Sequence, residues 1–393
     1  MSLLYALQGL DRDRFEPIVA LIRPNPEVSR LYEQAGVEVV SAPDIGTFEH
    51  TTACAARFTS PIGIVSFVRG VLRWNRSKRA TLALVQGIRP DLVHLNSVVL
   101  LPSATALNAA SIPFVWQVRE APARGYFGIR KAFVSRALCR FGEEVVFICR
   151  SDQKAWTDQK RGTVIYNFVD FKKFDFHHDQ STARRSLGIA AEAKVVLYLG
   201  GIARIKGVSI LLEALAAVRK RFPETICLMP NSTLESSGRF ISRAARKLLP
   251  LIGSGVFAQQ VKNQISELKL ETALRLLPFQ SSIATLIAAS DLIAFPSIEP
   301  HFARPVIEAA AMAKPVIASD LGGVNELIEH GKTGLLCPAG NAQALANGLE
   351  LLLQDAELRM QLGQEAHRQA VQRFESSWQV DKLMQIYERI LAT

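Results

Sequence analysis

Short apolar runs alternate with longer amphipathic segments along almost the whole chain. Runs of this kind are typical of buried strands, and the segments between them are typical of helices. Strands that alternate with helices predict parallel sheets joined by crossover helices. In the first half the predicted strands are Phe15–Ile22, Gly36–Val40, Leu92–Leu95, Phe114–Val118, Val145–Ile148 and Val164–Tyr166. In the second half they are Val195–Leu199, Thr225–Met229, Leu274–Leu277, Leu292–Phe295, Pro315–Ala318 and Gly334–Cys337.

The two series predict an α/β protein with two Rossmann-like doubly wound domains. The stretch Asp170–Arg185 is polar and has no apolar periodicity, so we place the linker there. The first domain then covers residues 1–170 and the second covers residues 171–374. No internal repeat of the solenoid type is present in the sequence.

Composition is that of a globular protein that contacts water on most of its surface. The chain has 393 residues, of which 49% are hydrophobic and 21% are charged. No apolar stretch reaches the roughly 18 residues that a spanning helix needs, and the first residues lack the pattern of a signal peptide. The five cysteines are scattered without the spacing of metal ligands. We therefore expect a cytoplasmic protein without a structural metal.

The segment after the predicted strand Leu292–Phe295 has the features of an anion site. Pro296 and Ser297 end the strand, a polar loop follows, and Pro305 opens an alanine-rich segment with helical character. The unpaired amides of a first helical turn attract anions. Glu308 lies close to that turn, where its carboxylate can accept hydrogen bonds from ribose hydroxyls. In a purely structural interpretation, the helix dipole stabilises this glutamate whatever the protein does.

The residues from Ser297 to Glu308 resemble the donor signature of retaining glycosyltransferases of family 4, which have the GT-B fold. That signature contains two glutamates at a fixed spacing, and Glu308 matches the second. Pro300 stands where the first is expected, and Glu299 lies one position upstream. Either Glu299 still reaches the donor sugar, or His301 makes that contact. The resemblance extends over nearly the whole chain and implies an active site in the cleft between the two domains.

A second part of the resemblance lies in the glycine turn after the strand Val195–Leu199. The turn carries Arg204 and Lys206, whose charges would offset a diphosphate at the carboxyl end of a parallel strand. Lys206 matches the phosphate-binding lysine of the family, whereas Gly201 stands where an arginine is common, so we expect Arg204 to replace that arginine. The alternative is a solvated loop with two surface cations. The other residues that the resemblance implies at the donor are Gly200, Gly201, His301, Phe302, Ala303, Arg304, Pro305 and Val306.

Four residues of the first domain follow two predicted strands and are candidates for the acceptor side. They are His94, Asn96, Arg119 and Glu120. Relatives often carry a histidine where this chain has Arg119, which leaves the sugar contact at that position open. A single histidine at a strand end is more often a structural hydrogen-bonding group than a ligand-binding one. We interpret Asn167–Asp170 and the glycines near Gly322 and Gly331 as turns of the fold.

The first and last segments of the chain can also be compared with those of relatives. Relatives begin with a strand and a glycine-rich loop, whereas this sequence opens on a predicted helix that leads directly into Phe15–Ile22. We therefore expect that the first strand and its loop are missing from this sequence. The segment Trp378–Leu391 is similar to the helix that crosses back onto the first domain, so residues 375–393 are expected to pack there.

The charge of the chain indicates a site of attachment to a membrane surface. The formal net charge is +10, and basic residues concentrate in Phe67–Arg79 and again in Arg239–Leu251. Cations beside apolar residues suit an anionic membrane surface. The alternative is a surface helix that packs its apolar side on its own domain. No nucleic-acid binding module is recognisable.

Taken together, the resemblance implies a transferase that moves a sugar from a nucleotide-diphosphate sugar to a glycan or lipid-linked acceptor. It implies retention of the anomeric configuration, no need for a metal and no other cofactor, and a role in cell-surface polysaccharide synthesis. Catalytic roles fall to Lys206, Arg204, Glu299 and Glu308. Two alternatives remain open: a nucleotide-sugar epimerase of the same architecture, and a catalytically silent, shortened homologue. The sugar, the base and the linkage are not encoded in a readable form.

Overall fold

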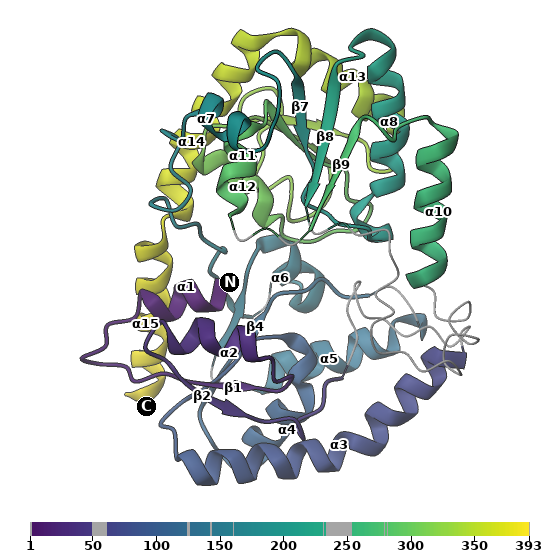
Figure 1. The fold of residues 1–393 in the computed structure, drawn as a ribbon. Coiled ribbons are helices and arrows are strands. Elements are labelled where there is room, and N and C mark those ends of the chain that lie inside the picture. The colour runs from purple at the N-terminus through teal and green to yellow at the C-terminus, as the bar shows by residue number, and fades with distance from the viewer. Residues whose placement is uncertain are drawn as a thin grey trace. The chain divides into compact units, whose positions relative to one another are not determined.

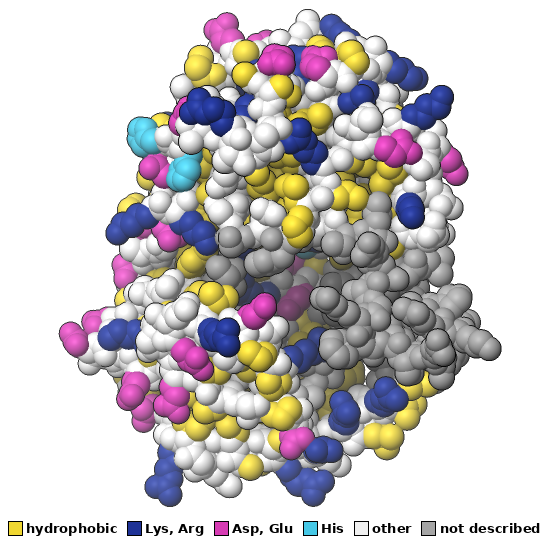
Figure 2. Space-filling view, viewed as in Figure 1, with side chains coloured by type: hydrophobic (Ala, Val, Ile, Leu, Met, Phe, Trp, Pro, Cys, Tyr) yellow, Lys and Arg dark blue, Asp and Glu magenta, His cyan; other side chains and the backbone are white. Residues whose placement is uncertain are grey.

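The structure is a computed structural model that describes residues 2–48, 61–123, 126–141, 144–159, 161–230, 232, 254–278, 280 and 282–392. The chain divides into two compact units (Figure 1). The first comprises Met1–Phe168 and Phe374–Thr393, and the second comprises Val169–Arg373. Lys and Arg side chains are spread over the visible surface of both units (Figure 2).

The strands of the first unit form two separate parallel ladders. One pairs β1 (Ile18–Leu21) with β2 (Glu38–Ser41). The other runs in the order β3 (Val93–Leu95), β4 (Phe114–Val118), β5 (Glu144–Phe147) and β6 (Thr163–Val164). The strands were predicted at nearly these positions, but β1 and β6 are shorter than their apolar runs, because partners pair with only part of each run.

Helices surround these ladders, and their bounds follow chain order. They are α1 (Ser2–Gln8), α2 (Pro26–Glu33), α3 (Pro61–Ile88), α4 (Leu101–Ala109), α5 (Ile129–Arg140), α6 (Arg150–Thr157) and α15 (Ser376–Leu391), with short 3₁₀ turns η1 (Val98–Leu100) and η2 (Tyr126–Gly128). The last helix, α15, places Val380, Leu383 and Ile386 in one apolar cluster with Leu4 of α1 and Val115 of β4. Residues more than 300 positions apart thus share a core.

A six-stranded parallel sheet forms the centre of the second unit. Its strands are β7 (Lys194–Leu197), β8 (Thr225–Pro230), β9 (Leu274–Leu277), β10 (Leu292–Phe295), β11 (Val316–Ser319) and β12 (Leu335–Cys337). Their spatial order is β12-β11-β10-β7-β8-β9. The order along the chain reverses between β7 and β10, and doubly wound sheets bind ligands at the carboxyl ends of the strands beside such a reversal.

The helices of the second unit flank this sheet. They are α7 (Gln180–Ser186), α8 (Val208–Arg221), α10 (Ser254–Glu267), α11 (Ile283–Ala289), α12 (Arg304–Ala311), α13 (Ala342–Gln354) and α14 (Ala356–Phe374), with a 3₁₀ turn η3 (Arg204–Lys206). Buried apolar residues of α8 recur at helical spacing, for example Leu211 and Leu215, and share a core cluster with Leu345 and Leu349 of α13.

One prediction about the connection between the units is wrong. The stretch Asp170–Arg185 was interpreted as a linker, yet it contains a helical segment, α7, whose Arg184 is buried. Asp179 caps this helix by accepting hydrogen bonds from the amides of Ser181 and Thr182. A helix this short does not show an apolar periodicity in the sequence. A single buried arginine anchors it, in place of an apolar face.

No helix within the described ranges is both long enough and apolar enough to cross a membrane.

Candidate functional site

The loops that follow β7 and β10 are joined to each other at the point where the strand order reverses. The amide of Ile298 donates to the carbonyl of Ile205 at 3.0 Å, and the Ser297 hydroxyl donates to the same carbonyl at 2.8 Å. Gly207 has a φ of +73°, and a Cβ there would lie 1.7 Å from the Pro296 carbonyl oxygen. Only glycine fits that close approach. The two loops therefore form one surface at the carboxyl edge of the sheet.

The glycine turn is held by a tyrosine that sequence analysis did not single out. Tyr198 is buried, and its hydroxyl lies 3.1 Å from the Gly201 carbonyl and 3.2 Å from the Lys206 carbonyl. A Cβ on Gly200 would lie 2.3 Å from the tyrosine ring. The signal was its position, since Tyr198 directly follows the buried run Val195–Leu197 and lies two residues before Gly200 and Gly201. It fixes the backbone that presents Lys206.

Lys206 and His301 meet between these loops. The lysine Nζ lies 2.5 Å from the His301 Nε2, and it lies 5.7 Å from the centre of the Phe295 ring. The His301 Nδ1 lies 2.9 Å from the Glu299 carbonyl oxygen. A carbonyl can only accept, so Nδ1 carries the proton and Nε2 accepts from the ammonium. Two residues that are 95 positions apart are thus brought into direct contact.

Burial changes the acid–base properties of both groups. It lowers the pKa of Lys206 to about 8. It also lowers the pKa of His301 to about 4, and the nearby charge of Lys206 adds to this effect. At neutral pH the histidine is therefore neutral and the lysine is charged. The lysine is a cation without a carboxylate partner among the described residues, which is the state that an anionic ligand would stabilise.

Helix α12 begins beside this pair, at Arg304, so Pro305 occupies the first turn of the helix. Glu308 lies one turn further and is 4% exposed. Burial raises its pKa, while the Arg304 guanidinium, with Nε 2.7 Å from Oε1, acts in the opposite direction. The carboxylate is therefore held by an arginine of its own helix in this structure. A ribose would have to share it or displace that arginine.

Two of the predicted catalytic residues do not join the Lys206–His301 pair. The Arg204 guanidinium lies 4.9 Å from the Phe257 ring centre and donates to the Gln260 side chain at 3.3 Å, so it contacts α10. The backbone carbonyl of Glu299 accepts hydrogen bonds from His301 and Ser297, but no side-chain contact is recorded for its carboxylate within the described part of the chain. His301, and not Glu299, is the side chain that this loop directs to Lys206.

Most of the remaining predicted donor residues follow His301 in the chain and are buried or half-buried. Phe302, Ala303 and Val306 are buried, and Pro305 is half-buried. Gly323, with a φ of +83°, is so close that a Cβ would lie 2.9 Å from the His301 carbonyl carbon. The glycines of this loop, which we had interpreted as turns, thus let the loop after β11 support the His301 backbone. These residues shape the site and leave its polar chemistry to Lys206, His301, Glu308 and the amides of α12.

Three of the four acceptor-side candidates in the first unit form one hydrogen-bond network. Arg119 donates to Asn96 at 3.3 Å, to Gln117 at 3.2 Å and to Asn167 at 2.8 Å. His94 lies 2.6 Å from the Tyr387 hydroxyl and 3.3 Å from the Gln117 amide oxygen. Burial lowers the pKa of His94 to about 4, so it is a neutral hydrogen-bonding group at physiological pH.

The fourth candidate, Glu120, lies at the ends of β3 and β4, where the Arg119 amide donates to its carboxylate at 3.2 Å. Its carboxylate accepts from the Ser97 hydroxyl at 2.6 Å and from the Val98 amide at 3.3 Å. Its carbonyl accepts from the Trp156 indole at 2.7 Å. These contacts hold the two strand ends together. Gln117 and Asn167, which hold Arg119, were not predicted as site residues because an amide side chain in a strand or turn carries no sequence signal of its own.

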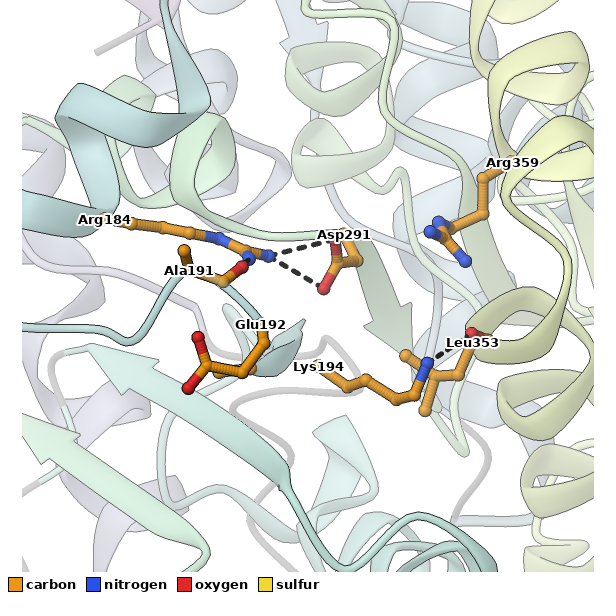
Figure 3. A pocket seen from close by; sticks show the side chains of 8 residues that line it. Arg184, Ala191, Glu192, Lys194, Asp291, Leu353 and Arg359 are labelled. Atoms are coloured by element: carbon orange, nitrogen blue, oxygen red, sulfur yellow. Dashed lines mark hydrogen bonds and ion pairs between the residues drawn. The ribbon is translucent and has the colours of Figure 1, made fainter.

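A polar cavity of about 190 Å³ lies at the opposite edge of the second sheet (Figure 3). Its lining includes Arg184 and Asp291, which form an ion pair, and Lys194 and Arg359. Lys194 donates to the Leu353 carbonyl at 2.9 Å, and Arg359 donates to the neighbouring carbonyl at 2.5 Å. These cations therefore donate hydrogen bonds to carbonyls at the carboxyl end of α13 that lack partners within the helix. We assign this cavity a structural role.

No cluster of histidine, cysteine or acidic side chains that could hold a metal ion occurs among the residues that the structure describes.

Comparison with known proteins places this geometry in a class. Residues 179–369, which lie within the second unit, match the family model Glycosyl transferases group 1. The chain is 27% identical over 227 residues to N-acetyl-alpha-D-glucosaminyl L-malate synthase of Bacillus anthracis, covering 58% of this chain and 53% of that protein. It is 32% identical over 214 residues to D-inositol 3-phosphate glycosyltransferase of Jonesia denitrificans, covering 54% and 47%. The chain thus spans about half the length of the curated relatives it matches.

Solved structures extend the likeness to the whole chain. Anabaena HepE in complex with UDP-glucose has a TM-score of 0.75 at 24% identity, covering 98% of this chain and 95% of that one. Sucrose-phosphate synthase from Thermosynechococcus elongatus has a TM-score of 0.71 at 18% identity, covering 99% and 97%. The chain therefore has the GT-B fold with two Rossmann-like units, as the sequence predicted.

Proposed function

We propose that this protein is a glycosyltransferase that takes its sugar from a nucleotide-diphosphate sugar. The observation that carries the proposal is the Lys206–His301 pair at the point where the strand order of the second sheet reverses. A half-buried ammonium without a carboxylate partner, paired with a histidine three residues before the start of α12, is suited to a diphosphate. The match to the group 1 family and the UDP complexes of a structural neighbour support this choice of ligand.

In the proposed reaction Lys206 exchanges its hydrogen bond to His301 for one to a phosphate oxygen. Its charge, together with the amides of α12, stabilises the negative charge that develops on the departing diphosphate. Glu308 accepts from the ribose hydroxyls, while Arg304 turns away or shares the carboxylate. His301 is neutral with its proton on Nδ1, so after the exchange its Nε2 can accept a hydrogen bond from a sugar hydroxyl. Glu299 remains the alternative for that sugar contact.

The finer parts of the proposal follow the resemblance found in the sequence. Transfer proceeds with retention of the anomeric configuration and needs no metal. The acceptor is a glycan or a lipid-linked molecule, the product belongs to a cell-surface polysaccharide, and the protein works at the inner face of a membrane. In the first unit His94, Asn96, Arg119 and Glu120 are the acceptor-side candidates. Full transfer activity in the presence of a metal chelator is the expected result, and loss of activity would contradict the metal-free mechanism.

Calorimetric titration with UDP, GDP and ADP tests the donor class. We expect one nucleotide to bind more tightly than the other two, because the base contacts loops outside the shared phosphate site. Incubation of the corresponding nucleotide sugar without an acceptor then separates transfer from epimerisation, since only an epimerase would convert the donor sugar. A folded protein that binds none of the three nucleotides would contradict the proposal.

Nucleotide affinity is expected to fall as the pH rises above about 8. Burial lowers the pKa of Lys206 to about 8 in the unliganded protein, so the side chain loses its proton there. A bound diphosphate favours the ammonium and raises that pKa, so binding above pH 8 requires proton uptake. The affinity then falls up to about ten-fold per pH unit until the pKa of the complex is reached. The check is calorimetry in buffers of different ionisation enthalpy, and a flat affinity between pH 7 and 10 would exclude Lys206 as the phosphate ligand.

A further inference from the structure

Two helices of the first unit carry almost the whole net charge of the protein. Helix α3 contains five Lys and Arg residues, and α5 contains four. Neither helix contains an aspartate or a glutamate, so their sum is +9, against +10 for the chain. A surface helix normally mixes both signs. These two helices therefore form a strongly cationic region on a protein that is otherwise close to neutral.

The same two helices and the turn before α5 expose apolar side chains. Among the described residues, the three most exposed large apolar side chains are Phe127 at 104%, Leu72 at 75% and Ile129 at 70%. Val65, Val68 and Val71 of α3 and Phe133 of α5 are also exposed. Single exposed apolar residues are ordinary, but a concentration of them marks an interaction surface. In Figure 2 hydrophobic and Lys or Arg side chains lie next to one another over α3, whose course Figure 1 shows.

Helix α3 has a packed face opposite to this exposed one. Ser77 and Thr81 are buried, and they bond to Gly46 and Ser103 respectively, which fixes the packed face. The exposed Val65, Val68 and Leu72 have the spacing of one helical stripe. Arg69 and Arg73 are exposed one position after Val68 and Leu72, so the cations lie along the edge of the apolar stripe.

The beginning of α5 continues this surface. The rings of Trp74 on α3 and Phe133 on α5 have centres 6.3 Å apart, and Phe48 contacts both. Phe127, in the turn before α5, has a φ of +54°, which is rare for a bulky residue and is usually retained where the side chain has a use. That conformation leaves the whole ring in solvent. We call the exposed residues of α3, η2 and α5 the α3–α5 surface.

We propose that the α3–α5 surface binds an anionic lipid bilayer. Cations at its edge would contact lipid phosphates, and Leu72, Phe127 and Ile129 would enter the boundary between headgroups and acyl chains. A nucleic acid would satisfy the cations but would leave the apolar residues in water, so the mixed surface favours lipid. The surface uses no residue of the donor site, and it rests on the proposed function only for the lipid-linked acceptor. Loss of membrane binding and loss of nucleotide binding are therefore separate outcomes.

Flotation of the purified full chain with vesicles tests this surface. We expect retention on vesicles of phosphatidylcholine with phosphatidylglycerol, weaker retention at high salt, and little retention on phosphatidylcholine alone. Arg69→Gln combined with Arg73→Gln should lower partitioning roughly 25-fold, at about five-fold for each cation. Leu72→Ser combined with Phe127→Ser should lower it about ten-fold or more, because the apolar insertion is lost.

Matched variants keep the test specific. Met360→Ser changes an apolar residue of α14 that is 55% exposed, and Lys220→Gln removes an exposed cation of α8; both should bind vesicles like the original protein. All variants are expected to keep their thermal midpoint and their nucleotide affinity. Absence of retention on anionic vesicles would overturn the proposal. So would retention that survives Leu72→Ser with Phe127→Ser, because that result fits a general polyanion site, and so would a dimer abolished by the same pair, because the occupant would then be a second copy.

Discussion

Replacing Lys206 with alanine is expected to reduce nucleotide affinity and turnover by about 100-fold, the usual effect of removing one charged donor to a developing anion. The side chain is half-buried, and its ammonium contacts the neutral His301 imidazole, which lies three residues before the start of α12. An exposed cation in water would be worth far less, because solvent screens it. The loss should appear both in calorimetric titration of the preferred nucleotide and in single-turnover transfer.

Arg204 offers the matched control for this variant. It stands two residues away in the same 3₁₀ turn, but its guanidinium is exposed and contacts Phe257 and Gln260. Arg204→Ala removes the same charge from the same turn, and we expect a loss of no more than about five-fold, as for an exposed charge. Equal losses in the two variants would contradict a phosphate site centred on Lys206 and would favour the substitution of Arg204 that the sequence suggested.

The Lys206→Ala variant is also expected to fold normally. Burial lowers the pKa of Lys206 to about 8 from its ordinary value of 10.5, so below pH 8 the charged form costs the folded state free energy. That cost disappears as the pH rises from 8 towards 10.5, and it also disappears when the lysine is removed. An unchanged or higher thermal midpoint at pH 7 would show that lost binding reflects a lost contact. A large drop in the midpoint would remove the support for its role in binding.

The sequence predicted the strands of the second unit and named candidate residues on two loops that the structure joins. Fully apolar runs such as Leu292–Phe295 form buried strands. The strand order then places the loops that follow β7 and β10 side by side. What it could not predict was the direction of side chains on those loops. Arg204 and Lys206 are two residues apart, yet a 3₁₀ turn sends one to α10 and the other to His301.

Contacts between distant residues explain most of the rest. The pairing of His301 with Lys206 and the network of Arg119 with Asn167 depend on packing, and neither leaves a periodic trace in the sequence. The prediction of a linker was wrong for the same reason. Helix α7 is anchored through Arg184 to a carboxylate 107 positions away. In the first unit, periodicity located each strand but did not indicate that β1 and β2 pair apart from β3–β6.

That carboxylate, Asp291, should be the most sensitive single position for the stability of the second unit. Asp291→Ala is expected to lower the free energy of unfolding by about 3–5 kcal/mol, as when one partner of a buried ion pair is removed. Arg184 donates to both carboxylate oxygens, at 3.0 and 2.9 Å, and the Val195 amide donates to one of them at 2.7 Å. The two side chains are only 8% and 15% exposed. The variant would leave a buried guanidinium without its counter-charge and the Val195 amide of β7 without this acceptor.

An exposed pair in the same unit provides the comparison. Arg221 lies 3.5 Å from Glu350, and the two side chains are 54% and 25% exposed. Arg221→Gln should cost less than about 1 kcal/mol, because water compensates the remaining charge. Urea denaturation of both variants gives the two values, and equal losses would refute the structural role of Asp291. The Arg184–Asp291 pair links α7 to the starts of β7 and β10 (Figure 3), so it fixes the two strands whose opposite ends carry Lys206 and His301. A fraction of Asp291→Ala that remains folded in the absence of urea should therefore still bind nucleotide.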